Sequence, residues 1–461
     1  MTKIPEIIQG GMGVGVSDFR LSREVSKERG LGVVSGTGLE ASLVRRLQLG
    51  DQTEEVRTAM QEFPNQEIVE KAINNYFIEG GKDKKEPFKL LPMHQVESPK
   101  KLLELTVLAN FVEVFLAKEG HSNPVGINYL EKIQLPHLAS IYGAMLAGVE
   151  VIEMGAGIQT QVPGILDSLS QGKPVTYKLN VEGATKIWNT YFDPKWILEK
   201  PNELHRPEFL GVISSNILAR ALITKSSGKV NGFVIEGPSA GGHNATPRRY
   251  QENERGEPIY GPKDEVNLNQ ISKLGLPFWL AGSYGTPEKL QEAKKLGAEG
   301  IQAGSIFALA KESGITRKLK QKILSQICNG EIDIFSDPKA SPTGFPFKII
   351  VDEAKAPPRI CDLGYLRTLY EKEEGIIGYR CPSENIESYL KKGGRIEDTV
   401  GKRCLCNALC SNVGLGQIDS KGNSEKPLIT LGKDISGIKH LAETKGEYSV
   451  EDVMKYLRKK D

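Results

Sequence analysis

One histidine stands where it could act on a bound substrate. His243 follows two glycines in the run EGPSAGGHNA at residues 236–245, directly after a short apolar segment, and none of the other five histidines has such a setting. A neutral imidazole can accept a proton near physiological pH, and an imidazolium can pair with an anionic substrate. Although a lone histidine is more often a structural residue, this setting makes His243 the candidate catalytic residue.

Two further turns could cradle a phosphate. They read AGSYG at 281–285 and QAGS at 302–305, with a helix-like segment at 287–297 between them. Glycine keeps side chains away from an anion, and free backbone N–H groups near a helix start favour negative charge. Gly282 and Gly304 are therefore expected to approach the phosphate, with Ser283 and Ser305 as hydroxyl donors.

A third glycine-rich loop, QGGMGVG at 9–15, follows the first apolar run. A dinucleotide fingerprint needs glycine at relative positions one, three and six, but Val16 and Asp18 occupy the sixth position in the two possible registers. The spacing therefore excludes a Rossmann loop. It favours a turn whose backbone can approach a flat ligand closely.

Cysteines gather late in the chain, with residues 361, 381, 404, 406 and 410 falling within fifty positions. Four thiolates could hold zinc or an iron–sulfur cluster. The paired C-x2-C knuckles that mark a zinc site are missing, however, and reduced cysteines also pack as small apolar side chains. No metal ligand is therefore predicted.

The elements that must position these residues read as βα units around a buried parallel sheet. Eight strands followed by glycine-rich turns predict a closed (β/α)8 TIM barrel. The strand candidates are residues 6–9, 32–35, 124–128, 150–154, 174–179, 232–236, 278–281 and 300–303.

The barrel is expected to span residues 1–313, with helical insertions at about 40–122 and 185–230. A helix is predicted at 102–118 in the first insertion, because its apolar residues fit a helical period. Residues 314–461 lose the strand rhythm and are expected to form an appended, Cys-bearing subdomain that ends in a helix at 450–458.

Composition excludes several function classes. The 60 Lys and Arg balance 58 Asp and Glu among 461 residues, and no stretch mixes basic residues with aromatics, so nucleic-acid binding is not expected. No apolar run approaches the roughly 18 to 20 residues that cross a bilayer. The N-terminus lacks a secretory pattern, so a cytoplasmic location is expected, and a homo-oligomer remains open.

Together, the segments IIQGGMGVGVS (7–17), EGPSAGGHNA, AGSYGTP (281–287) and LGAEGIQAGSIF (296–307) are similar to the nitronate monooxygenase family, formerly called 2-nitropropane dioxygenases. They also resemble the sister group of FMN-dependent enoyl-acyl carrier protein reductases. The likeness spans about residues 4–310. Two departures are the AGSYG turn, where the family more often has a GGI-type sequence, and the long insertions.

The resemblance implies FMN as the cofactor and His243 as the catalytic base. It places Gly11 and Met12 along the isoalloxazine, Asn128 at the ring edge, and Lys178 near the ring. The predicted cofactor-binding residues are Gly10, Gly11, Met12, Asn128, Lys178, Gly241, Gly242, Gly282, Ser283, Gly304 and Ser305.

Three functions compete on this basis. The first is oxidation of alkyl nitronates with O2 to a carbonyl compound and nitrite. The second is reduction of a carrier-bound enoyl chain with NAD(P)H. The third is a flavin-binding scaffold without catalysis. The expected substrate is a small acidic or acyl-type molecule, and the nitronate monooxygenase reaction is the favoured prediction.

Overall fold

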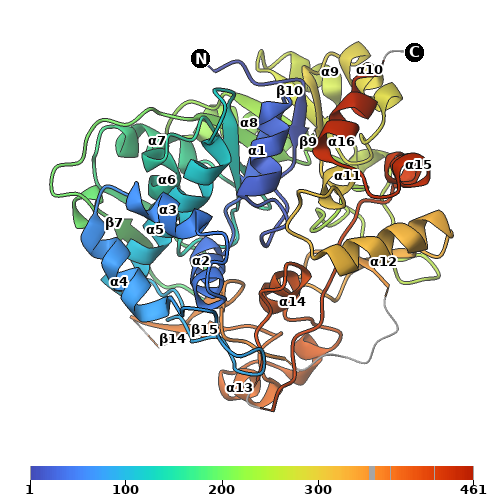
Figure 1. The fold of residues 1–461 in the computed structure, drawn as a ribbon. Helices are drawn as coiled ribbons and strands as arrows, with labels where there is room; N and C mark the ends of the chain where they lie inside the picture. Colours follow the sequence, from blue (N-terminus) through green and yellow to red (C-terminus); the bar gives the residue numbers. More distant parts are fainter. Residues whose placement is uncertain (1, 352–358, 374, 420, 460–461) are drawn as a thin grey trace.

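Eight parallel strands close into a barrel, in the order β1, β11, β10, β9, β8, β4, β3 and β2 (Figure 1). The computed structural model describes residues 2–351, 359–373, 375–419 and 421–459. The barrel strands are β1 (Ile7–Gln9), β2 (Leu31–Ser35), β3 (Val125–Leu130), β4 (Val151–Gly155), β8 (Glu208–Ile213), β9 (Gly232–Glu236), β10 (Phe278–Ala281) and β11 (Gly300–Ala303). The predicted (β/α)8 barrel is confirmed.

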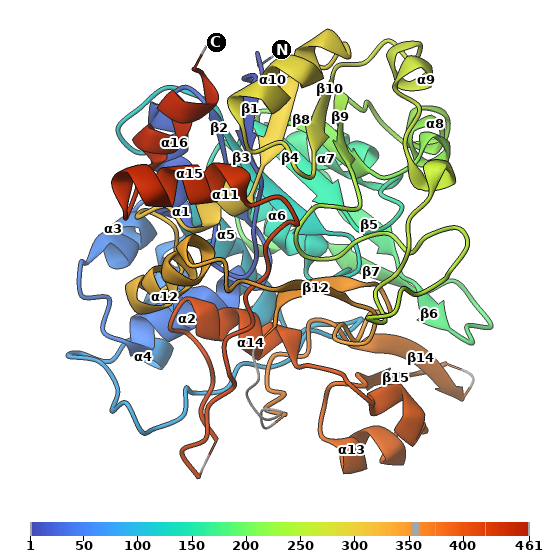
Figure 2. The ribbon, with the colours of Figure 1, turned by 90° about the vertical axis from the view of Figure 1, so that its right-hand side faces the viewer.

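Helices surround the barrel (Figure 2). Those between barrel strands are α1 (Phe19–Lys27), α2 (Leu39–Gln48), α3 (Glu55–Gln61), α4 (Gln66–Tyr76), α5 (Lys100–Lys118), α6 (His137–Leu146), α7 (Val162–Ser170), α8 (Asn216–Lys225), α9 (Leu268–Ser272) and α10 (Pro287–Lys295), with the short α11 (Ser305–Ala308) after β11. The helix predicted at 102–118 is therefore confirmed as α5. Most of α5 is buried, because it packs against α1, α2 and α6.

Apolar side chains fill the inside of the barrel. Alternate residues of a barrel strand point inward, and bulky or branched side chains close the interior. Trp279 is the largest of them, and its indole N–H donates to the Pro5 carbonyl at 2.9 Å. The interior cluster comprises Ile8, Leu31, Val33, Val151, Leu210, Val212, Val234, Trp279 and Ala281.

One predicted barrel strand is wrong. Residues 174–179 form β5 (Val175–Lys178), which pairs antiparallel with β7 (Asn189–Phe192) outside the barrel. Burial alternates along β5, as in a sheet with one face in water. The barrel strand is instead β8, which lies within the predicted insertion at 185–230 and is buried on both faces from Phe209 to Ile213.

The C-terminal region covers the mouth of the barrel and then returns along its side (Figures 1 and 2). Its strand β14 pairs in parallel with β6 (Val181–Glu182), and its last helix, as predicted at 450–458, packs on α1. Its elements are α12 (Arg317–Cys328), β12 (Ile334–Asp337), β13 (Phe347–Ile350), β14 (Thr368–Glu373), β15 (Ile376–Arg380), α13 (Ile386–Lys391), α14 (Leu405–Asn412), α15 (Ser436–Lys445) and α16 (Val450–Leu457).

Arg45 of α2 ties the barrel to this C-terminal region. Its side chain is 3% exposed, forms an ion pair with Asp362 at 2.9 Å, and donates to Asn407 Oδ1 at 2.9 Å and the Leu415 carbonyl at 2.6 Å. Arg45→Met is expected to lower the free energy of unfolding by about 3–5 kcal/mol, because it leaves the carboxylate of Asp362 with an uncompensated charge. Urea unfolding measures this change.

The control removes an arginine from an exposed pair. Arg317 pairs with Glu447 at 3.1 Å, and its side chain is 77% exposed, so Arg317→Met should leave the free energy of unfolding close to that of the wild type. Equal effects of the two substitutions would show that the buried connection contributes no more than a surface ion pair.

Candidate active site

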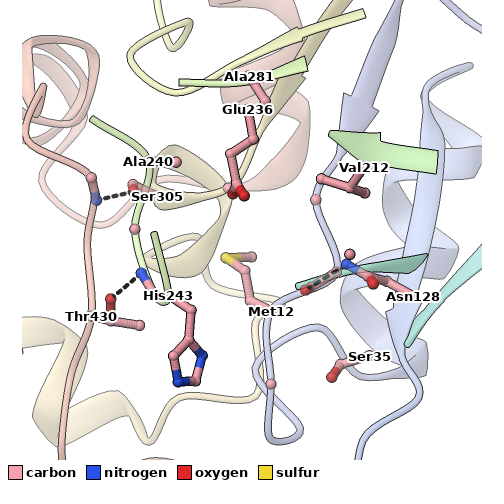
Figure 3. Close-up of a pocket in the computed structure, with 18 of the residues that line it drawn as sticks. Met12, Ser35, Asn128, Val212, Glu236, Ala240, His243, Ala281, Ser305 and Thr430 are labelled. Carbon is pink, nitrogen blue, oxygen red and sulfur yellow. Dashed lines mark hydrogen bonds between the residues drawn. The ribbon is translucent and has the colours of Figure 1, made fainter. Parts of the chain in front are cut away.

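A cavity of about 290 Å³ opens at the carboxyl ends of the barrel strands (Figure 3). Each of the eight strands, or the loop directly after it, contributes to its wall. This is the face on which (β/α)8 enzymes carry their catalytic residues.

The structure brings together nearly all of the residues that the sequence singled out. Lys178 is the exception: it lies at the exposed end of β5, where its backbone N–H donates to Gln161 Oε1 at 2.8 Å, and it does not line the cavity. The predicted residues that line the cavity are Gly10, Gly11, Met12, Asn128, Gly241, Gly242, His243, Gly282, Ser283, Gly304 and Ser305.

Three glycines shape the cavity wall: at one of them no side chain fits, and at the other two the missing side chain leaves open space. A Cβ atom at Gly11 would lie 2.5 Å from the Cβ of Asn128, so only glycine fits there. A Cβ at Gly304 would lie 3.4 Å from the sulfur of Met12, in space beside the cavity. At Gly242, where φ is +75°, a Cβ would meet no atom within 4 Å. These loops leave room for a ligand to approach the backbone.

The two predicted phosphate loops carry serine at both turns. Ser283 has a φ of +62°, a left-handed conformation that costs a non-glycine residue about 1 kcal/mol or more. The hydroxyl of Ser305 accepts a hydrogen bond from the backbone N–H of Gly432 at 2.7 Å, which ties this turn to the C-terminal region. Its own hydrogen can still be donated to an anion.

His243 is held on the opposite side of the cavity from β3 (Figure 3). Its Nε2 lies 2.7 Å from the Ser341 hydroxyl, and its ring meets Phe347 edge-on with centroids 4.7 Å apart. Next to it, the Gly242 N–H donates to Thr430 Oγ1 at 2.6 Å. The C-terminal region therefore fixes the orientation of the imidazole.

The charge around His243 suits an anion. Burial, with a smaller effect from the Lys132 ammonium, lowers the pKa of His243 to about 3. Burial also lowers the pKa of Lys132 to about 8, so that this amine is mostly protonated at neutral pH. The free site thus presents a neutral imidazole on which the positive charge of Lys132 acts from outside the cavity lining.

Two glutamates, one at the cavity and one buried behind its wall, form what we call the floor of the cavity. Glu236 lines it, and Glu153 is fully buried on β4. With its amide nitrogen turned toward Glu153, Gln302 donates to both carboxyl oxygens at 3.1 Å. Burial, with the neighbouring Glu236 charge, raises the pKa of Glu153 to about 8, and burial raises the pKa of Glu236 to about 7. The carboxyl groups of Glu153 and Glu236 are therefore partly protonated near neutral pH.

A buried lysine, Lys348, acts electrostatically on the carboxyl group of Glu236. Lys348 of β13 donates from Nζ to the Pro238 carbonyl at 2.5 Å and to Asn244 Oδ1. Burial lowers its pKa to about 7, and its positive charge opposes the rise in the pKa of Glu236. Lys348 and Glu236 thus act on each other electrostatically, and both have a pKa of about 7.

The sequence reading missed the floor and the C-terminal wall. Glutamate inside the apolar runs VIEMG and FVIEG is a signal for the floor, because an ionisable side chain is rarely buried without a partner or function. No local pattern marks the C-terminal wall. Its residues are Phe347, Tyr365, Leu366, Leu405, Cys406, Leu409, Thr430, Gly432, Asp434, Gly437 and Ile438.

Among residues 2–351, 359–373, 375–419 and 421–459, no three or more His, Cys, Asp and Glu side chains are grouped so as to hold a metal ion. Over the same residues, no helix combines the length and the apolar character needed to span a membrane.

Comparison with solved structures found several similar chains. FabK from Thermotoga maritima is 14% identical, over 98% of this chain and 91% of that chain, with a TM-score of 0.48. A nitroalkane oxidase from Streptomyces ansochromogenes is 12% identical, over 98% and 94%, with a TM-score of 0.46. The enoyl reductase domain of MlnA from Bacillus amyloliquefaciens is 14% identical, over 75% and 63%, with a TM-score of 0.37. A scan against protein-family models and a search of curated proteins found no match.

Proposed function

We propose that the chain is an FMN-dependent oxidoreductase of the nitronate monooxygenase type, which oxidises an alkyl nitronate with O2 to a carbonyl compound and nitrite. The observation that carries this proposal is a neutral imidazole, His243, in the wall of a glycine-lined cavity, with the charge of the Lys132 ammonium acting on it. A nitronate is a small anion, and this pair offers it a hydrogen-bonding ring and a positive charge. The sequence motifs at this cavity resemble the same family.

The cavity loops would hold the cofactor. Gly282, Ser283, Gly304 and Ser305 would cradle the phosphate, while Met12 and neighbouring backbone would border the ring. The open space beside Gly304 fits this role, since a side chain there would fill it. FMN, when bound, supplies the electron-accepting centre and the reaction with O2.

The protein's own groups would manage the proton and the charge. His243 would take the proton from the carbon beside the nitro group, or hydrogen-bond a substrate that arrives as the anion. Lys132 would stabilise the negative charge, and that charge would in turn raise the pKa of His243, so that the imidazole keeps the proton. Ser341, at 2.7 Å from Nε2, would keep the ring in position.

An anaerobic absorbance titration tests the proposal. Adding propyl-2-nitronate to the FMN-loaded protein is expected to bleach the flavin, whereas NADH or NADPH is expected to leave it oxidised. Gly304→Val should bind FMN weakly, because its side chain would project toward Met12 and the cavity. Bleaching by a pyridine nucleotide alone would contradict the nitronate reaction, and failure to take up FMN would contradict the flavin site itself.

The apolar wall favours a second candidate, an enoyl-acyl carrier protein reductase. Leu130, Ile133, Leu405 and Leu409 line the cavity and could accept an acyl chain. Glu236, whose pKa burial raises to about 7, could act as a proton source. The same titration separates the candidates, since only this reaction requires reduction by NADH or NADPH. A flavin-binding scaffold would bleach with neither reagent.

A further inference from the structure

One short stretch of the C-terminal region crosses three of the loops that form the cavity. We call residues 430–438 the strap; it leads into α15, which begins at Ser436, and includes the first turn of that helix. The strap lies far beyond residues 4–310, the part of the chain that carries the family resemblance. Its residues that line the cavity are Thr430, Gly432, Asp434, Gly437 and Ile438.

The strap is hydrogen-bonded to the loop that carries His243. The backbone N–H of Gly242 donates to Thr430 Oγ1 at 2.6 Å, as Figure 3 shows. The backbone N–H of Lys433 donates to the carbonyl of Ser239 at 2.9 Å, three residues earlier in the same loop. The loop after β9 is therefore fastened to the strap at two points.

The strap also meets both predicted phosphate loops. After β11, the Ser305 hydroxyl accepts a hydrogen bond from the backbone N–H of Gly432 at 2.7 Å (Figure 3). After β10, the contact is between backbones, because a Cβ atom at Gly437 would overlap the carbonyl oxygen of Gly285. Only glycine at position 437 permits this approach. The strap thus contacts the loops of three neighbouring barrel strands, β9, β10 and β11.

The barrel loops and the strap share one part of the cavity wall. Gly285 and Ser305 line it from the barrel, and Asp434 and Gly437 line it from the strap. The Asp434 carboxylate accepts hydrogen bonds from the backbone N–H of Ser436 at 3.0 Å and from its hydroxyl at 2.6 Å, and these donors offset part of its negative charge. A segment that only packed on the outside of the barrel would supply no wall residues. A ligand held by the phosphate loops is therefore bounded by the strap as well.

We propose that the strap is part of the cofactor site and holds the loops after β10 and β11 in the arrangement that receives the phosphate of FMN. This inference rests on the flavin site proposed above. It gives a cofactor-binding role to a segment outside the family-like part of the chain. Residues 314–461 are then no separable appendage, because the barrel without them has an incomplete phosphate site.

Comparison of FMN with riboflavin tests the proposal, because riboflavin has the same ring and ribityl chain but no phosphate. Full-length protein freed of flavin is titrated with each compound, and quenching of flavin fluorescence gives the two Kd values. Wild type is expected to bind FMN more tightly than riboflavin. Gly437→Ala, whose Cβ would push the strap away from Gly285, should weaken FMN binding at least about tenfold, as loss of one hydrogen bond to a charged group does. Its affinity for riboflavin should stay that of the wild type.

Gly261→Ala is the matched control. A Cβ at Gly261 would meet no atom within 4 Å, and this residue does not line the cavity, so both Kd values should equal those of the wild type. Gly432→Ala is a milder second variant, because its Cβ would lie 3.1 Å from the Ser239 carbonyl oxygen. It should weaken FMN binding less than Gly437→Ala does, and it decides the matter if Gly437→Ala fails to fold.

The outcomes separate the strap from the flavin site itself. If wild type binds FMN and the folded strap variants bind it equally well, the strap has no part in the site and the proposal is overturned. Equal losses for FMN and riboflavin would also overturn it, because the effect would then not concern the phosphate. A wild-type protein that binds neither flavin would contradict the proposed flavin site, and this inference with it.

Discussion

Replacing His243 by alanine is expected to lower kcat on a neutral nitroalkane by about 10²- to 10⁴-fold, because the protein loses the group that accepts the proton from the carbon beside the nitro group. The flavin content should stay near that of the wild type, since the predicted phosphate loops lie on other strands. Steady-state oxygen consumption and the flavin absorbance of the purified variant measure the two effects.

The pH dependence gives a second readout for the same residue. Because burial lowers the pKa of His243 to about 3, the imidazole of the free protein stays neutral well below pH 6.5. The acid limb of kcat/KM that reports this group should therefore lie far below the pH at which an exposed histidine would place it.

His440→Ala is the matched control, because this exposed histidine lies on α15 and stacks on Tyr456 away from the cavity. It should leave kcat unchanged. If His243→Ala retains wild-type turnover, the proton acceptor is another group, and the Glu236 carboxyl at the cavity floor becomes the leading candidate.

The barrel could be predicted from sequence wherever a strand is buried on both faces. The runs at β2, β4 and β9 are short, apolar and followed by polar or glycine-rich turns. The error at β5 arose because Val175 and Tyr177 resemble such a run, although Thr176 and Lys178 face solvent. The run FLGVI of β8 carried the better signal, since it is apolar without interruption.

The wall of the site could not be predicted in the same way. A glycine-rich loop that directly follows a barrel strand can be recognised from its position in the sequence, and for this reason His243 and Gly304 could be predicted as site residues. The partner of His243, Phe347, is 104 positions away along the chain and meets it through an isolated bridge. Such a contact depends on how two distant segments pack against each other. Neither segment contains a sequence pattern that predicts the contact.

The roles of Glu153 and Glu236 could not be predicted from the sequence pattern around each of them. Glu153 and Glu236 occur in apolar strands, and a period-based reading counts each of them only as a tolerated polar residue. Their environment depends on the barrel, which brings β4 and β9 to the same interior, buries the carboxyl of Glu153 completely and places Glu236 at the cavity. Burial in a low dielectric then favours the protonated form.

Glu153→Gln is expected to make the protein more stable at pH 8 than the wild type, with a smaller difference at pH 5. Burial raises the pKa of Glu153 to about 8, against a usual value of 4.5. Below pH 4.5 both the folded and the unfolded chain hold the proton, but as the pH rises toward 8 only the folded chain still does. Folded stability therefore falls through this window, by roughly a few kcal/mol.

Glutamine cannot ionise, so the variant should lose this pH dependence while its amide still meets the Gln302 side chain. Urea unfolding of FMN-saturated protein at pH 5 and pH 8 measures the difference, and Glu62→Gln on the exposed end of α3 is the control. If wild type and Glu153→Gln lose stability equally between the two pH values, the carboxyl at the cavity floor is ionised in the folded protein. Its place beside Glu236 would then require a compensating positive charge, and Lys348, which acts electrostatically on Glu236, is the candidate.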